Sequence, residues 1–191
     1  MTKVPRGFAV YGALAVVLAA GLITLLVFGP RWLATVPEEA GTAAPAAVEA
    51  RKIRARLFYV DEAGTGLAGV EQEVLFAEGT AEQARRIIEA QLAAPAAPYV
   101  SAIPAGTKLR TVFFTTTGEI YLDLSAEVQT SHPGGTTNET LTVYTLVSAL
   151  TSNLPAVSRV QILVDGKEVD TLAGHLDLRR PIEPDLKWVT N

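Results

Sequence analysis

The sequence predicts an α+β fold: a mixed sheet of about six strands with two helices on one face, preceded by a single transmembrane helix. Three observations support this prediction. Residues 7–29 form a run of 23 positions without a charged side chain. Six later runs show strand-like alternation or β-branched and aromatic composition. Two stretches among them repeat apolar residues at helical spacing, which gives the order β-β-α-β-β-α-β-β of an α+β module.

The apolar segment is long enough to cross a membrane. A helix over residues 7–29 would reach about 34 Å at about 1.5 Å per residue, against a hydrocarbon core of roughly 30 Å. Lys3 and Arg6 precede it, so the positive-inside rule places residues 1–6 in the cytoplasm and the rest of the chain outside. The alternative is a cleaved signal peptide, whose apolar region is usually only about 7 to 15 residues long. We therefore expect the lipid bilayer to be one partner, through residues 7–29.

Three further segments follow the anchor. Residues 30–52 are rich in Ala and Pro and lack apolar periodicity, which indicates a linker. Residues 53–184 carry the periodic patterns of a folded domain, which this topology places on the periplasmic or cell-wall side. Residues 185–191 are expected to be a C-terminal tail.

The first half of the domain predicts two strands and a helix. Residues 53–60 alternate with a period of two, and residues 69–77 form a second strand after a Gly-containing turn. Thr80 and Gln83 have the spacing of a capping box, and apolar residues then recur at helical spacing over 81–93.

The second half repeats this order. Residues 108–116 and 119–124 flank a glycine and predict a hairpin. Thr136 and Glu139 again have capping-box spacing, ahead of a helix over 138–153. Strands over 157–164 and 168–172 follow, joined by Asp165-Gly166, a strong hairpin signal.

Composition excludes several kinds of chemistry. The absence of cysteine rules out thiol catalysis, thiolate metal sites and disulfides. The net charge of −4 argues against nucleic-acid binding, which needs a positive surface. With only two histidines, His132 and His175, any histidine-based metal site would need carboxylates as further ligands.

Four residues are the candidate binding positions: Asp123, Asp165, His175 and Asp177. Glu119 lies on the same strand face as Asp123, but residues four apart on a strand are about 13 Å apart, too far for acid/base work unless the strand curves. A polar sheet face or strand-end hydrogen bonding is the favoured role of Asp123. His175 with Asp177, joined by His132, is a weaker metal hypothesis because the spacing is not that of a metal site. We therefore expect no catalytic residue, no metal and no cofactor.

The domain resembles the GerMN domain, a sporulation and spore-germination module of bacterial envelope proteins. The resemblance covers the chain from about residue 53 to about residue 184. It rests on the order and spacing of these segments: Ile-Pro-Ala-Gly-Thr-Lys-Leu at 103–109, Tyr-Leu-Asp-Leu-Ser at 121–125 with Glu127, the helix over 141–154, Val-Gln-Ile-Leu-Val-Asp-Gly-Lys at 160–167, and Gly-His-Leu-Asp at 174–177 before Pro181. It implies a membrane- or lipid-anchored extracytoplasmic domain and, by likeness to ring-building modules of spore-envelope assemblies, protein interaction. It carries over no catalytic residue, and we expect one copy of the domain.

The sequence thus favours a non-catalytic, single-pass membrane protein whose exposed domain binds an envelope protein or peptidoglycan. One alternative is a cell-wall-active enzyme that uses surface carboxylates, namely Glu119, Asp123, Asp165 or Asp177. Another is an assembly subunit that self-associates into a ring or stack through exposed strand edges or helix faces.

Overall fold

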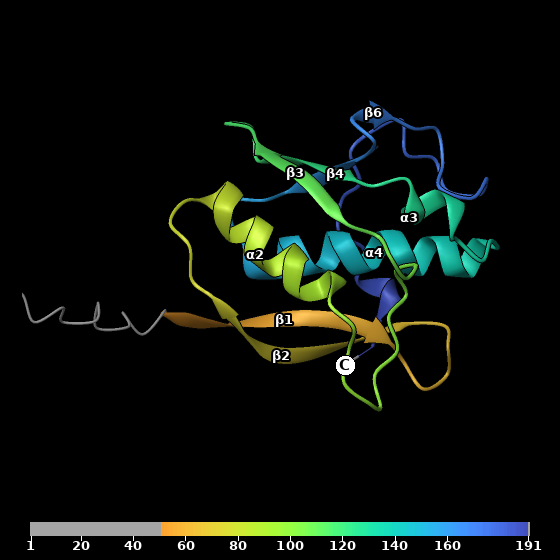
Figure 1. The fold of residues 1–191 in the computed structure, drawn as a ribbon, viewed down its shortest axis with the longest axis horizontal. Helices are drawn as coiled ribbons and strands as arrows, with labels where there is room; N and C mark the ends of the chain where they lie inside the picture. Colours follow the sequence, from red (N-terminus) through yellow and green to blue (C-terminus); the bar gives the residue numbers. More distant parts are fainter. Residues whose placement is uncertain (1–50, 191) are drawn as a thin grey trace, which may run out of the picture. The chain divides into compact units, whose positions relative to one another are not determined.

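The computed structural model describes residues 51–190 and confirms the α+β class. The predicted arrangement of the strands is wrong. They form two separate sheets instead of one mixed sheet of about six strands. Figure 1 shows helices α2 (Thr80–Leu92) and α4 (Thr136–Asn153) between the second sheet and the hairpin of strands β1 (Lys52–Val60) and β2 (Leu67–Leu75). The expectation of helices on one face of a single sheet is therefore also wrong. The predicted transmembrane segment, residues 7–29, lies outside the described residues. Within residues 51–190, no helix combines the length and apolarity needed to cross a bilayer.

The first sheet has the order β1-β2-β7. Strands β1 (Lys52–Val60) and β2 (Leu67–Leu75) form an antiparallel hairpin, in which Leu57 lies opposite Val70. The two-residue strand β7 (Val189–Thr190) pairs in parallel with the start of β2. The segment expected to be a C-terminal tail therefore contributes a strand to this sheet.

The second sheet has the order β3-β4-β5-β6. Strands β3 (Leu109–Phe114) and β4 (Glu119–Leu124) form the predicted hairpin, and β5 (Arg159–Val164) runs parallel to β4. Strand β6 (Lys167–Glu168) is shorter than expected, because the chain turns away after it and the Asp170 carbonyl instead accepts a hydrogen bond from Leu178 N.

The Asp165-Gly166 turn joins β5 to β6 as predicted. Both residues have positive φ, 50° for Asp165 and 77° for Gly166. A two-residue hairpin turn that matches the right-handed twist of its strands requires positive φ at both central residues. Glycine adopts positive φ without steric cost.

Three α-helices and one 3-10 helix complete the described part of the chain. They are α2 (Thr80–Leu92), α3 (Glu127–Thr130), α4 (Thr136–Asn153) and the 3-10 helix η1 (Leu186–Trp188). The two long helices begin close to the predicted positions. Their caps are glycines, Gly79 and Gly135, without a side-chain cap hydrogen bond, so both predicted capping boxes are wrong.

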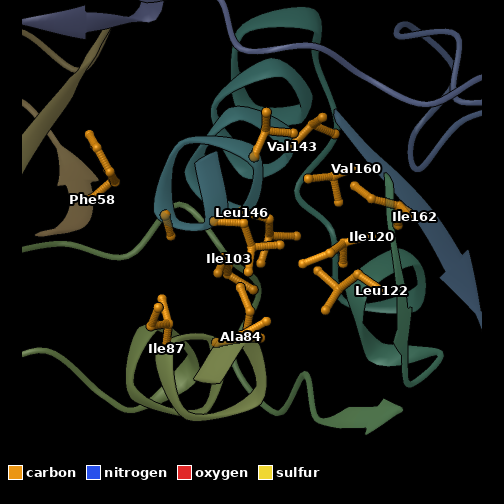
Figure 2. Packing of buried hydrophobic residues seen from close by; sticks show 14 of the residues in the cluster. Phe58, Ala84, Ile87, Ile103, Ile120, Leu122, Val143, Leu146, Val160 and Ile162 are labelled. Atoms are coloured by element: carbon orange, nitrogen blue, oxygen red, sulfur yellow. The ribbon is translucent and has the colours of Figure 1, made fainter. Parts of the chain in front are cut away.

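One hydrophobic core connects both sheets to the helices. Helix α4 crosses its centre, and Figure 2 shows side chains of α4, among them Leu146, close to Ile120 of β4 and Val160 of β5. Ala84 and Ile87 of α2 face the same core. The central helix therefore contacts partners on several sides, which explains why polar residues on it are also buried.

The free edge of β1 is closed by groups from outside its sheet. Arg56 and Phe58 each exchange two backbone hydrogen bonds with a side-chain amide, Asn153 of α4 and Gln91 of α2 respectively, all at 2.8 Å. Val60 N donates to Val100 O at 2.9 Å. Because these alternate residues supply the strand's outward polar groups, β1 cannot pair with a strand of the second sheet there. This is the physical reason for two sheets.

Candidate functional site

Asp123 and Asp165, two of the predicted positions, are brought together by Arg110 of β3. Arg110 Nε donates to Asp123 Oδ2 and Arg110 Nη1 donates to Asp165 Oδ1, both at 3.0 Å. The other oxygen of Asp123 accepts a hydrogen bond from Gly166 N at 2.7 Å. The cluster thus links β3, β4 and the β5–β6 turn, and both oxygens of Asp123 are occupied by groups of the fold.

Burial distinguishes the two carboxylates of this cluster. The Asp123 side chain is 9% exposed, whereas that of Asp165 is 50% exposed. A buried carboxylate needs partners to offset its lost hydration, and the guanidinium and the backbone N–H supply them. Asp123 therefore holds the turn in place, while Asp165 forms a solvent-exposed ion pair.

Glu119 and Asp123 do not form a carboxylate pair. Glu119 lies at the start of β4, where its Oε1 is 2.9 Å from Arg159 Nε on the neighbouring strand. Asp123 lies near the other end of β4 and binds Arg110. Each carboxylate therefore has its own arginine.

His175 and Asp177 lie in the loop over residues 170–179, which lines a hollow of about 200 Å³. Asp170, Thr171 and Arg179 complete the lining. Arg179 binds both oxygens of Asp177, through Nε at 2.9 Å and Nη2 at 2.7 Å. Hydrogen bonds from the Arg179 side chain and backbone lower the pKa of Asp177 far below its ordinary value. At neutral pH the rim of this hollow therefore carries a paired carboxylate and guanidinium.

The loop is attached to α4 by a fully buried carboxylate, Glu139, which is 0% exposed. Glu139 Oε1 accepts from Leu172 N, and Oε2 accepts from His175 N, both at 2.8 Å. His175 Nδ1 lies 3.2 Å from the same Oε2. Glu139, predicted as a helix cap, instead organises the loop that contains His175 and Asp177.

The surroundings of Glu139 keep it ionised. Burial by itself raises the pKa of this carboxyl, but the backbone N–H groups of Ala173, His175, Leu172 and Leu176 outweigh burial, and the net pKa is lowered. Several N–H donors converging on one carboxylate have this effect because they stabilise its charged form.

His132 lies near the same helix but has different partners. Its Nδ1 accepts from Gly134 N at 2.9 Å, so the ring proton is on Nε2, which donates to Thr142 Oγ1 at 3.1 Å. Burial lowers the pKa of His132, with Glu139 raising it and His175 lowering it further. The described residues contain no group of three His, Cys, Asp or Glu side chains placed to hold a metal ion. The hypothesis that His132 joins His175 in a metal site therefore has no geometric support within residues 51–190.

The sequence reasoning missed the roles of four polar residues, Gln91, Glu139, Asn153 and Gln161. All bind backbone groups far away in the chain, as Gln161 does when its Nε2 donates to Leu178 O at 2.7 Å. A signal was present for Glu139, because positions 139, 143, 146 and 150 share one helix face and all are buried. A charged residue on the apolar face of a helix predicts a buried hydrogen-bond partner for that residue.

The comparisons agree on the fold. The family model described as "Germane: Sporulation and spore germination" matches residues 56–170. A protein described as a lipoprotein from Clostridium perfringens is 24% identical, with a TM-score of 0.50 and coverage of 69% of this chain and 87% of that one. The tandem GerMN domains of the sporulation protein GerM from Bacillus subtilis are 17% identical, with a TM-score of 0.52 and coverage of 71% of this chain and 46% of that one. No curated protein sequence matches the chain significantly.

Proposed function

Because the chain belongs to the Germane family of sporulation and spore-germination domains, we propose that it is a membrane-anchored extracytoplasmic binding module of the bacterial cell envelope. Its partner in this proposal is another envelope protein or peptidoglycan. The uncharged run over residues 7–29 supports the anchor. A protein of similar fold from Clostridium perfringens is described as a lipoprotein, and this description agrees with a membrane-anchored domain.

One observation carries the non-catalytic part of the proposal: each carboxylate suggested for catalysis is committed to a partner within the fold. Asp123 and Asp165 bind Arg110, Asp177 binds Arg179, and Glu119 lies against Arg159. A general acid and base need two carboxyl groups that lie about 5 to 10 Å apart and flank one substrate, with pKa values pushed apart. The arginines instead engage all four carboxylates within the fold, which suits a structural role.

The binding role is tested by crosslinking in native membranes. The full, anchored chain is crosslinked in cells and purified, and its partners are identified by mass spectrometry. We expect an envelope protein or peptidoglycan fragments to be retained. Recovery of the chain with neither would contradict the proposal.

The alternative function, a cell-wall-active enzyme, makes a different prediction. The full chain in detergent is incubated with purified peptidoglycan, and soluble fragments are measured. We expect no release. Release that the Asp123→Asn variant abolishes, while Asp165→Asn retains it, would replace the binding proposal with an enzymatic one.

The topology can be tested with the same chain, because it contains no native cysteine. A membrane-impermeant maleimide should label a Leu186→Cys variant in intact cells and leave a Thr2→Cys variant unlabelled until the membrane is opened. Labelling of Thr2→Cys in intact cells would contradict the proposed orientation.

A further inference from the structure

The outer edge of β3 differs from the closed edge of β1. Strand β3 lies at the border of its sheet and pairs only with β4. Thr115 N donates to Glu119 O, so the residues that bond to β4 are Thr115, Phe113 and Thr111. The N–H and C=O groups of Val112 and Phe114 therefore point away from β4. Within residues 51–190, these outward groups form no hydrogen bond.

In the described part of the chain, the outer edge of β2 is also open beyond Leu67 and Ala68, where β7 pairs with it, but that stretch carries two glutamates, Glu71 and Glu73. Protein strands at a border usually carry lysine, proline or a cover that prevents pairing with another chain. Strand β3 has the sequence Leu-Arg-Thr-Val-Phe-Phe, with Arg110 as its one charge. That charge already binds Asp123 and Asp165. Beside the edge, Phe113 projects a 60% exposed aromatic ring.

From these observations we propose that β3 is a self-association edge, which pairs antiparallel with β3 of a second copy around a two-fold axis at Phe113. In this register Val112 of one copy lies opposite Phe114 of the other, so all the outward groups of these two residues find partners. The pairing is isologous, with the same edge used by both copies, and it extends one sheet across the dimer. This inference goes beyond the proposed envelope binding and does not depend on it.

The side chains fit a second copy of the same strand. The two Phe113 residues form a non-hydrogen-bonded cross-strand pair, in which Cβ atoms lie about 4.5 to 5.5 Å apart and aromatic rings contact each other. Arg110 lies opposite Thr116, so no like charges face each other in the pair. A basic or acidic peptide would gain the backbone hydrogen bonds but no free charge to pair with, because Arg110 already binds Asp123 and Asp165, whereas an identical strand also buries both exposed rings.

The test uses single-cysteine variants of the full chain in its membrane, which the lack of native cysteine makes unambiguous. Phe113→Cys should form an intermolecular disulfide under mild oxidation, since a non-hydrogen-bonded pair brings the Cβ atoms close to the span of a disulfide. The matched control is Leu186→Cys, which is 81% exposed and outside β3. We expect the disulfide of Phe113→Cys to form at least about tenfold faster, because pairing raises the local thiol concentration. Equal rates would overturn the proposal.

A charge exchange tests the register. Phe113→Lys and Phe113→Glu are surface changes that leave the core intact, and each places like charges opposite one another in the dimer. In detergent each variant alone should be monomeric, and an equal mixture should recover a heterodimer by sedimentation. A mixture that stays monomeric, or single variants that still dimerise as the wild type does, would overturn the pairing. Crosslinking of Phe113→Cys only to a different protein would assign the edge to that partner and equally overturn self-pairing.

Discussion

The side-chain amide of Gln91 replaces a neighbouring strand for Phe58. Its Oε1 accepts from Phe58 N and its Nε2 donates to Phe58 O, both at 2.8 Å. Gln91 lies on α2 and is 0% exposed. One residue of a helix thereby satisfies both outward backbone groups at the middle of β1, as Asn153 of α4 does two residues earlier.

Gln91→Leu should destabilise the domain strongly. Leucine suits the apolar surroundings but leaves the buried N–H and C=O of Phe58 without partners, at a cost of about 2 to 4 kcal/mol. The midpoint of urea denaturation should fall accordingly. Glu89→Gln, an exposed change on the same helix, serves as the control and should change stability by less than about 0.5 kcal/mol. Equal stability of Gln91→Leu and wild type would show that the amide does not close the edge.

The capped edge also explains how far the sequence could predict the fold. The β3–β4 and β5–β6 hairpins depend on local signals, alternation and an Asp-Gly turn, and both were predicted. The division into two sheets depends on Gln91 and Asn153, whose roles arise only when the helices meet β1. Alternation within a strand carries no information about such partners, so a single sheet was the expected arrangement.

The candidate site shows the same limit. Thr136 and Glu139 have capping-box spacing, yet Glu139 points to the loop over 170–179 because Leu172 and His175 offer backbone donors from a distant part of the chain. The spacing alone cannot distinguish a cap from a buried position on the apolar face. His175 and Asp177 were candidates for their chemistry, but the residue that positions their loop was not.

Removing the charge of Glu139 should change how stability depends on pH. The folded state lowers the pKa of Glu139 below its ordinary value of 4.5. The stabilisation is therefore fully present above about pH 4.5 and is lost as pH falls through the lower folded-state pKa. Glu139→Gln should cost about 1 to 3 kcal/mol at neutral pH, and the difference from wild type should shrink in acid. Urea denaturation from pH 7 down to pH 3 measures this, and a constant difference would contradict it.

His132 should titrate below the ordinary histidine value of 6.5. Burial opposes the charged ring, and protonation of Nδ1 would also break its hydrogen bond from Gly134 N. Because the folded-state pKa is lowered, this contribution to stability is present above about pH 6.5 and is lost as pH falls through the folded pKa.

The chain contains two histidines, so ring signals in an NMR titration are easily assigned with a His175→Asn variant. A His132 pKa at or above 6.5 would contradict the buried arrangement. His132→Asn, which keeps an acceptor near the position of Nδ1, should remove this part of the pH dependence while the Glu139 contribution at lower pH remains.

Asp123 and Asp165 share Arg110 but should differ in their effect on stability, which separates a buried structural carboxylate from an exposed ion pair. Asp123→Asn keeps an acceptor for Gly166 N but loses the charged hydrogen bond from Arg110. Because water cannot replace that bond at a buried position, we expect the free energy of unfolding to fall by about 1 to 2 kcal/mol. Asp165→Asn acts on a half-exposed pair, for which solvent screening leaves less than about 0.5 kcal/mol. Both substitutions remove one negative charge beside the same arginine. The difference between their losses of stability therefore reports the effect of burial and not that of net charge. Urea denaturation of the two variants in parallel measures it. Equal losses would mean that burial adds nothing to the interaction of Asp123 with Arg110, and would contradict the role of Asp123 as a buried structural carboxylate.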